Sequence, residues 1–168
     1  LRNVGVNWPR TTAYGLGHNG LYINLKGREA KGIVGPAQRE TLLTELAAKL
    51  EALQDENGKP VVRKVYRSDR IYSGPQTKNA PDLIIGYHRG YRIDSKSAKG
   101  DIGNKMLMDN TTPWSADHCF DPREIPGVLF CNRVVTAKTP SLIDLAPSIL
   151  GEFGLGKPAV MEGQNVFA

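Results

Sequence analysis

The sequence predicts an α/β protein, with a partial layered sheet and helices packed on it. Continuous apolar runs without polar alternation, such as residues 82–87, are typical of strands that are buried on both faces. These runs alternate along the chain with an amphipathic helix pattern over residues 37–54, as expected for a layered α/β domain. Three or four strands are few for an independent doubly wound sheet, so we expect one flank of a larger sheet.

Length and composition are those of a folded domain. The chain has 168 residues, of which 40% are hydrophobic and 23% are charged, which excludes a disordered or fibrous chain. We expect a single domain over residues 1–168. Apolar runs such as residues 128–131 are far shorter than the roughly 18 residues that span a bilayer, so no membrane span is expected. No charged-then-apolar leader follows Leu1, so we expect a mature chain or a piece of a longer one.

The first half of the chain contains the clearest helix. The glycine-rich first 35 residues predict turns around one strand at residues 21–25. Leucines then recur at helical spacing, which predicts a helix over residues 37–54. These leucines are Leu42, Leu43, Leu46, Leu50 and Leu53. Gly58 and Pro60 end the helix pattern.

Two strands are expected after this helix. The β-branched run at residues 61–66 predicts the first strand, and a helical turn is expected at residues 68–72. The apolar run at residues 82–87 predicts the second strand, fully buried. Residues 88–126 are polar and rich in turn formers, and connections of this length are often functional.

The C-terminal part is expected to add one strand and one helix. Residues 127–132 predict another buried strand, and residues 144–153 predict a helix with Pro147 in its first turn. Cys119 and Cys131 lack C-x-x-C spacing, and we expect them to be small buried residues.

Positive charge is concentrated in the middle of the chain. The chain has 22 Lys and Arg against 17 Asp and Glu, and residues 59–105 contain 11 of these bases but only 4 of the acids. Such a stretch can attract phosphate groups or a nucleic acid. It is equally typical of a solvated surface, and the sequence leaves both interpretations open.

Lys26 and Arg28 are candidate substrate-binding residues. They follow the strand expected at residues 21–25, and strand ends of open α/β sheets are where ligands bind. Lysine and arginine both complement phosphate. The alternative is that Arg28 and Glu29 pair with neighbours and hold the loop. The nearby G-x-G-x-x-G pattern at residues 15–20 lacks a preceding strand and a following helix, so it predicts a turn and no dinucleotide site.

A polar segment at residues 109–121 is the richest in candidate metal ligands. It contains three carboxylates and His118, and imidazole and carboxylate are common zinc ligands. A lone histidine in a polar loop is more often a surface group, so the pattern alone is weak. His18 and His88 are expected to be structural or exposed. The sequence contains no G-x-S-x-G elbow and no P-loop, so no self-sufficient enzyme is visible.

Six phrases in order resemble the C-terminal part of the alkaline phosphatase superfamily. The branch concerned is the predicted phosphohydrolase/phosphomutase branch, which is similar to type I phosphodiesterase/nucleotide pyrophosphatase enzymes. The phrases cover most of the chain. They are Thr11–Tyr14, Gly20–Glu29, Ala80–Leu83, Trp114–His118, Pro126–Phe130 and Asp144–Leu150.

The resemblance implies the C-terminal portion of an alkaline phosphatase-like fold and a phosphate-ester substrate. It also implies two divalent metal ions, usually zinc, which activate a Ser or Thr nucleophile and stabilise charge on the transferred phosphoryl group. Matched by residue, His118 is one metal ligand, while Asp117 and Asp121 flank it without being carried over as ligands.

The nucleophile and the other ligand motifs of the family are absent from these 168 residues. We expect these motifs in the upstream part of the same protein, which would then be the partner of this segment. We therefore expect this chain alone to be inactive and to bind no metal tightly. Two alternatives stay open: a non-catalytic module that binds nucleic acid or another polyanion, and a parent protein that has lost its nucleophile.

Overall fold

The computed structural model describes residues 5–97, 101, 103, 105–114 and 119–167. The chain divides into two compact units, residues 1–126 and 127–168. The first unit contains a sheet with a long helix, and the second contains a short helix with its flanking loops. Within the described residues, no helix is both long and apolar enough to cross a membrane.

A four-stranded sheet forms the centre of the first unit, with strand order β1-β2-β4-β3. Each neighbouring pair is antiparallel, so β2 and β3, which flank β4, run parallel to each other. The strands are β1 (Ala13–Gly15), β2 (Gly20–Ile23), β3 (Val62–Arg67) and β4 (Leu83–Tyr87). The α/β prediction is confirmed at the level of a mixed α/β protein, and the sheet is antiparallel between neighbours.

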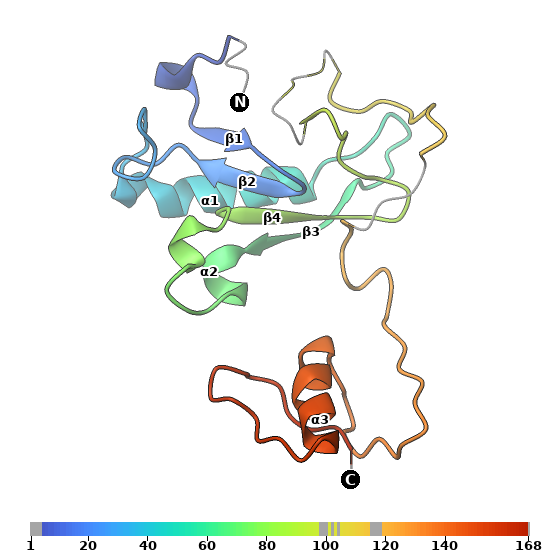
Figure 1. Ribbon diagram of the computed structural model, residues 1–168. Coiled ribbons are helices and arrows are strands. Elements are labelled where there is room, and N and C mark those ends of the chain that lie inside the picture. Colours follow the sequence, from blue (N-terminus) through green and yellow to red (C-terminus); the bar gives the residue numbers. More distant parts are fainter. Residues whose placement is uncertain (1–4, 98–100, 102, 104, 115–118, 168) are drawn as a thin grey trace. The chain divides into compact units, whose positions relative to one another are not determined.

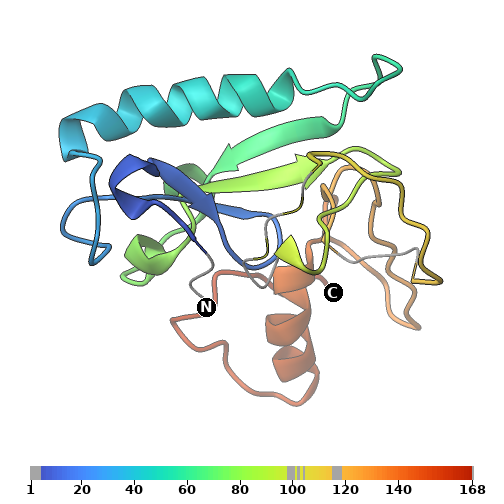
Figure 2. The ribbon, with the colours of Figure 1, turned by 90° about the horizontal axis from the view of Figure 1, so that it is seen from above.

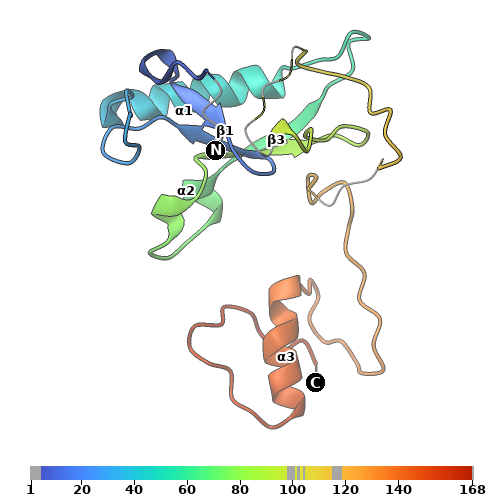
Figure 3. The same ribbon diagram turned by 45° about the horizontal axis from the view of Figure 1, so that its top comes forward.

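Helix α1 (Pro36–Glu51) connects the parallel strands β2 and β3 and lies along one face of the sheet (Figures 1 and 2). Pro36 occupies the first turn, where its missing N–H costs little. The helix predicted at residues 37–54 is therefore confirmed, although it ends earlier than the leucine pattern suggests. Short helical segments complete the unit (Figure 3): η1 (Trp8–Arg10), α2 (Ser68–Ile71) and η2 (Thr77–Asn79).

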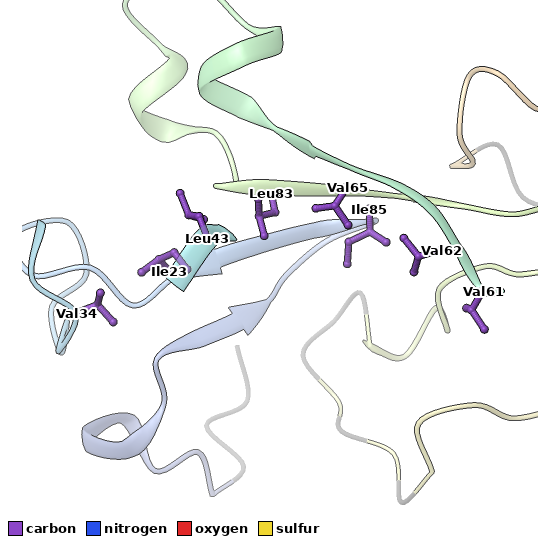
Figure 4. Packing of buried hydrophobic residues seen from close by; sticks show 8 residues of the cluster. All are labelled: Ile23, Val34, Leu43, Val61, Val62, Val65, Leu83 and Ile85. Atoms are coloured by element: carbon purple, nitrogen blue, oxygen red, sulfur yellow. The ribbon is translucent and has the colours of Figure 1, made fainter. Parts of the chain in front are cut away.

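The hydrophobic core lies between α1 and the sheet. Leu43 of α1 is fully buried and belongs to one cluster with Ile23 and Leu83 (Figure 4). Ile85 belongs to the same cluster, so alternation along β4 directs Ile84 and Gly86 to the opposite face of the sheet. This opposite face receives the polar segment that follows residue 118.

The strands expected at residues 21–25, 61–66 and 82–87 correspond to β2, β3 and β4, with small shifts at their ends. The strand at residues 82–87 is buried only in part, because Ile84 and Tyr87 are half-buried. Strand β1 is not predicted by the sequence. Its residues are held as a strand by pairing with β2, which places Tyr14 opposite Tyr22.

The second unit is built around α3 (Leu145–Glu152), which follows η4 (Leu142–Asp144) and confirms the helix predicted at residues 144–153. Ser148 of α3 is fully buried, and its hydroxyl accepts the amide of Val166 at 2.9 Å. The C-terminal residues thereby pack against α3, with Val166 itself 1% exposed.

The buried strand predicted at residues 127–132 is wrong. The structure assigns no strand there, and Val128 and Phe130 are 81% and 91% exposed. An apolar run becomes a buried strand only when another strand pairs with it, and no described residue pairs with this run. Cys131 is exposed for the same reason, contrary to the expectation that it is buried.

Candidate functional site

Each end of β4 has a buried carboxylate next to it. Asp82 directly precedes the strand and is 2% exposed, whereas Asp121 belongs to the later polar segment and is 0% exposed. Ionised carboxylates are rarely buried without partners, because desolvation penalises the charge. The hydrogen-bond partners of the two carboxylates therefore show which parts of the fold are joined at each end of β4.

Asp82 accepts hydrogen bonds from three residues of other parts of the unit. Its Oδ2 accepts the amide of Ile23 at 2.8 Å and Nη2 of Arg28 at 2.6 Å. Its Oδ1 accepts Nη2 of Arg39 from α1 at 2.7 Å. Burial raises the pKa of Asp82, but the hydrogen bonds from Arg28, Ile23 and Arg39 outweigh burial and hold the pKa below its usual value.

Lys26 and Arg28, the predicted substrate-binding residues, lie in the turn after β2 at this end of β4. Arg28 donates from Nε to Glu29 at 2.8 Å and from Nη2 to the carbonyl of Ile23 at 2.7 Å, in addition to its bond with Asp82. Its side chain is 26% exposed. Lys26 is exposed, and its amide donates to the carbonyl of Val34. Arg28 is therefore paired with neighbouring groups, as expected if it holds the loop after β2.

Glu29 extends this network to β1. The hydroxyl of Tyr14 donates to Glu29 at 3.1 Å, and the amide of Leu25 donates to it at 2.7 Å. Burial and the adjacent Glu29 carboxylate raise the pKa of Tyr14 to about 12, since both oppose formation of the phenolate.

Asp121 lies against the sheet at the other end of β4. The hydroxyl of Tyr66 in β3 donates to Asp121 Oδ2 at 2.7 Å, and the amide of Arg123 donates to Oδ1 at 2.9 Å. A side chain at Gly86 would collide with this carboxylate: a Cβ there would lie 3.1 Å from Asp121 Cγ. Burial raises the pKa of Asp121, but the bonds from Arg123 and Tyr66 outweigh it and lower the pKa below its usual value.

A second contact joins this segment to the turn between β1 and β2. The side-chain amide of Asn19 donates to the carbonyl of Cys119 at 2.7 Å. The carbonyl of Asn19 in turn accepts the amide of Ile85 in β4 at 2.8 Å. Cys119 and Asp121 are therefore both attached to the strand end, through different residues.

Glu124 provides a third contact. It accepts Nη1 of Arg63 in β3 at 2.5 Å and lies 3.4 Å from Nδ1 of His88, which follows β4. The hydrogen bond from Arg63 holds the pKa of Glu124 below its usual value. His88 thus has a structural contact, as expected, while His18 is exposed.

The predicted metal ligand His118 lies outside the described residues, together with Ser115 and Asp117. Across residues 5–97, 101, 103, 105–114 and 119–167, no three His, Cys, Asp or Glu side chains form a group that could hold a metal ion. Asp121 is already hydrogen-bonded to Tyr66 and Arg123, and Glu124 is already hydrogen-bonded to Arg63. The described side chains therefore do not make a metal site by themselves.

Arg28 and Asp121, which belong to the two segments singled out in the sequence, do not lie together in the structure. Arg28 contacts Asp82 before β4 begins, whereas Asp121 lies over Gly86 near its end. Four residues of a strand span about 13 Å, so these contacts lie at opposite ends of β4.

Part of the positive charge of residues 59–105 is compensated by acids from elsewhere in the chain. Lys64 pairs with Glu51 at 2.8 Å, and Arg67 pairs with Glu40 at the same distance. Arg63 pairs with Glu124. These pairs reduce the charge available to a polyanion.

Sequence reasoning missed Asn19, Tyr66 and Gly86 as residues that hold this segment. Glycine inside an otherwise apolar strand indicates a close approach by another group, and Gly86 had that property. Asparagine tolerates left-handed backbone better than most residues, which made Asn19 a candidate for a special position. Tyr66 gave no comparable signal.

Comparisons with protein-family models, with curated proteins and with solved structures found no match to this chain.

Proposed function

We propose that the chain is part of a metal-dependent phosphohydrolase, of the phosphodiesterase/nucleotide pyrophosphatase or phosphomutase type. His118 supplies one metal ligand, and Lys26 and Arg28, at the other end of β4, bind a part of the phosphate-ester substrate that lies away from the metal centre. The observation that carries the proposal is the attachment of residues 119–124 to the sheet, because these residues directly follow His118 in the sequence.

The metal centre needs more ligands than this segment offers. The described residues contain no group that could hold a metal ion. The proposal assigns the remaining ligands and the nucleophile to other parts of the protein. Bound divalent ions would stabilise charge on the phosphoryl group. The 168-residue chain alone is accordingly expected to show no turnover.

Arg28 retains a donor for substrate in this proposal. An arginine side chain has five N–H groups, and the contacts described above use those on Nε and Nη2. We assign the substrate contact to Nη1. Asp82 and Glu29 then orient the guanidinium that meets the substrate.

The test uses the full-length protein with His118→Ala, and His18→Ala as the matched control. We expect His118→Ala to lower zinc affinity at least tenfold and to abolish hydrolysis of p-nitrophenyl phosphate mono- and diesters, while His18→Ala retains both. Zinc affinity is measured by calorimetric titration. Wild-type zinc affinity in the His118→Ala protein, or no esterase activity in the intact protein with any divalent metal, would contradict the proposal.

A further inference from the structure

The face of the sheet opposite α1 carries one large side chain from each strand. Ala13, Ile23 and Val65 pack toward the core on the α1 side, so alternation along the strands directs their neighbours to the other face. These neighbours are half-buried. They are Tyr14 of β1, Tyr22 of β2, Ile84 of β4 and Tyr66 of β3.

Ring planes and guanidinium groups meet on this face. The rings of Tyr14 and Tyr22, a directly opposed cross-strand pair, are stacked with centroids 5.5 Å apart and an interplanar angle of 13°. The guanidinium carbon of Arg28 lies 5.8 Å from the ring centroid of Tyr22, and that of Arg123 lies 5.8 Å from the ring centroid of Tyr66. Two separate tyrosine–arginine pairs therefore lie on one face of the sheet.

The strand register gives the spacing between these two pairs. Ile84 is paired with Gly20 on one side and with Tyr66 on the other. Tyr22 lies two residues beyond Gly20, about 6.7 Å along β2, and β2 and β3 are about 9.6 Å apart with β4 between them. The Cα atoms of Tyr22 and Tyr66 are thus about 12 Å apart. Aromatic side chains on a four-stranded sheet can stack two or three bases of a single strand at such a spacing.

Positive charge without a partner lies in the segments that border this face. Residues 5–35 contain four Lys and Arg but a single acid. Three of these bases, Arg10, Lys26 and Lys31, are exposed, and their side chains make no hydrogen bond or ion pair with another described residue. Lys26 belongs to the turn that carries Arg28. These cations are available to phosphate groups.

Hydrogen bonds and ring packing bring two of the cations close to the tyrosines. The side-chain amide of Asn24 donates to the carbonyls of Trp8 and Lys31, at 3.2 and 3.1 Å. The ring of Trp8 meets the ring of Tyr14 edge-on, with centroids 5.4 Å apart. Arg10 follows Trp8 in η1. Phosphate-binding groups and ring faces therefore lie on the same side of the unit.

We propose that this face of the sheet binds single-stranded nucleic acid. Bases stack on the Tyr14–Tyr22 pair and on Tyr66, while Lys26 and Lys31 contact the phosphates. Stacking on aromatic side chains accepts any base, because every base has a π-face. A duplex keeps its bases stacked on one another, so the face selects single strands. This activity uses no metal ion and does not depend on the proposed function.

The test measures fluorescence anisotropy of a labelled oligothymidylate of about 12 nucleotides with the 168-residue chain. We expect Tyr22→Leu to weaken binding at least about fivefold, because each stacked base contributes at least that factor. Tyr91→Leu is the matched control. The ring of Tyr91 also has a cation over it, Lys59 at 5.2 Å, but it packs against the core on the α1 side. This variant should bind as the wild type does.

A double variant tests the phosphate contacts without touching the sheet. In Lys26→Gln/Lys31→Gln, the slope of log affinity against log salt should fall by about 0.7 for each phosphate contact removed. Both side chains are exposed, so the variant should fold normally. Lys49→Gln, on α1 with its side chain 77% exposed, is the control and should keep the wild-type slope.

Three results would overturn the inference. The first is no binding at about 100 μM protein, the weak limit of non-specific nucleic-acid binding. The second is equal or tighter binding of a duplex or of inorganic polyphosphate of the same length, since charge alone would then explain the affinity. The third is wild-type binding by a folded Tyr22→Leu protein. If Tyr22→Leu fails to fold, the comparison of single strand, duplex and polyphosphate with the wild type still decides.

Discussion

Asp82 and Asp121 are both buried beside β4, but they hold different parts of the protein. Asp82 joins β4 to two other elements, through the amide of Ile23 in β2 and the guanidinium of Arg39 in α1. Asp121 joins strand β3 to the segment at residues 119–124. The hydroxyl of Tyr66 provides the contact with β3, and the amide of Arg123 provides the contact within the segment.

The difference lies in how much of the fold depends on each carboxylate. Loss of Asp82 separates elements that also share the hydrophobic core, so the whole unit should lose stability. Loss of the Asp121 contacts releases a segment with few core contacts, and such segments open locally at lower free energy. Single substitutions around the two carboxylates test this difference in stability.

The largest effect is expected for Asp82→Asn. The substitution removes the negative charge and leaves Arg28 and Arg39 facing an amide, and breaking a buried ion pair on one side costs about 3 kcal/mol. Urea unfolding of the 168-residue chain measures this loss. Asp109→Asn, at an exposed position, is the control and should change the free energy of unfolding by less than about 0.5 kcal/mol. Equal effects of the two variants would contradict the assignment of Asp82.

Gly86→Ala should have the next largest effect. The new methyl group would lie 3.0 Å from Cβ of Asp121 and collide with its carboxylate, which we expect to cost about 2 kcal/mol and to displace the segment. Limited proteolysis should then cut within residues 119–126 before the sheet unfolds. Gly127→Ala is the control, because its Cβ would have no atom within 4 Å. A Gly86→Ala protein as stable and protease-resistant as the wild type would show that Asp121 does not lie there.

Tyr66→Phe tests the hydrogen bond of Asp121 alone. It removes the donor at 2.7 Å and leaves the ring in place, so we expect a loss of about 1 kcal/mol in the free energy of unfolding. Tyr72→Phe, on an exposed tyrosine, should have no measurable effect in the same urea titration. If Tyr66→Phe lowered the free energy of unfolding as much as Asp82→Asn does, the two carboxylates would not differ in their contribution to stability.

The smallest effect concerns Tyr14 and appears only at alkaline pH. Its pKa is raised from an ordinary value of 10 to about 12, so the folded state retains the proton more tightly than the unfolded state. The resulting stability is complete below pH 10 and is lost as the pH rises through about 12. The difference in unfolding free energy between the wild type and Tyr14→Phe should therefore shrink above pH 10. A difference that is constant with pH would contradict the contact with Glu29.

Local patterns were sufficient for much of the fold. The leucine spacing predicted α1, and β-branched or apolar runs predicted β3 and β4, because these signals lie within a few consecutive residues. Residues 127–132 have the same apolar character as β4 but no described pairing partner, and pairing is not a property of the run itself. Strand β1 was missed for the converse reason, since its pairing with β2 outweighs its weak strand propensity.

The candidate site was predictable only in part. The sequence singled out Arg28 and the segment at residues 109–121, but it could not place them at opposite ends of one strand. The Asp121 contact with Gly86 joins residues that are far apart in the sequence, as does the Asn19 contact with Cys119. Contacts of this kind depend on the assembled sheet.

Hydrogen exchange of three amides tests most directly that the two carboxylates hold different structures. The amide of Ile23 donates to the carboxylate of Asp82, and the amide of Arg123 donates to the carboxylate of Asp121. The amide of Glu124 donates to the backbone carbonyl of Asp121 and reports on the same turn. In Asp121→Asn, exchange should accelerate at Arg123 and Glu124 while Ile23 keeps its wild-type protection. In Asp82→Asn, Ile23 should lose protection together with the core strands. Loss of protection at all three amides in Asp121→Asn, or at none of them, would contradict this division.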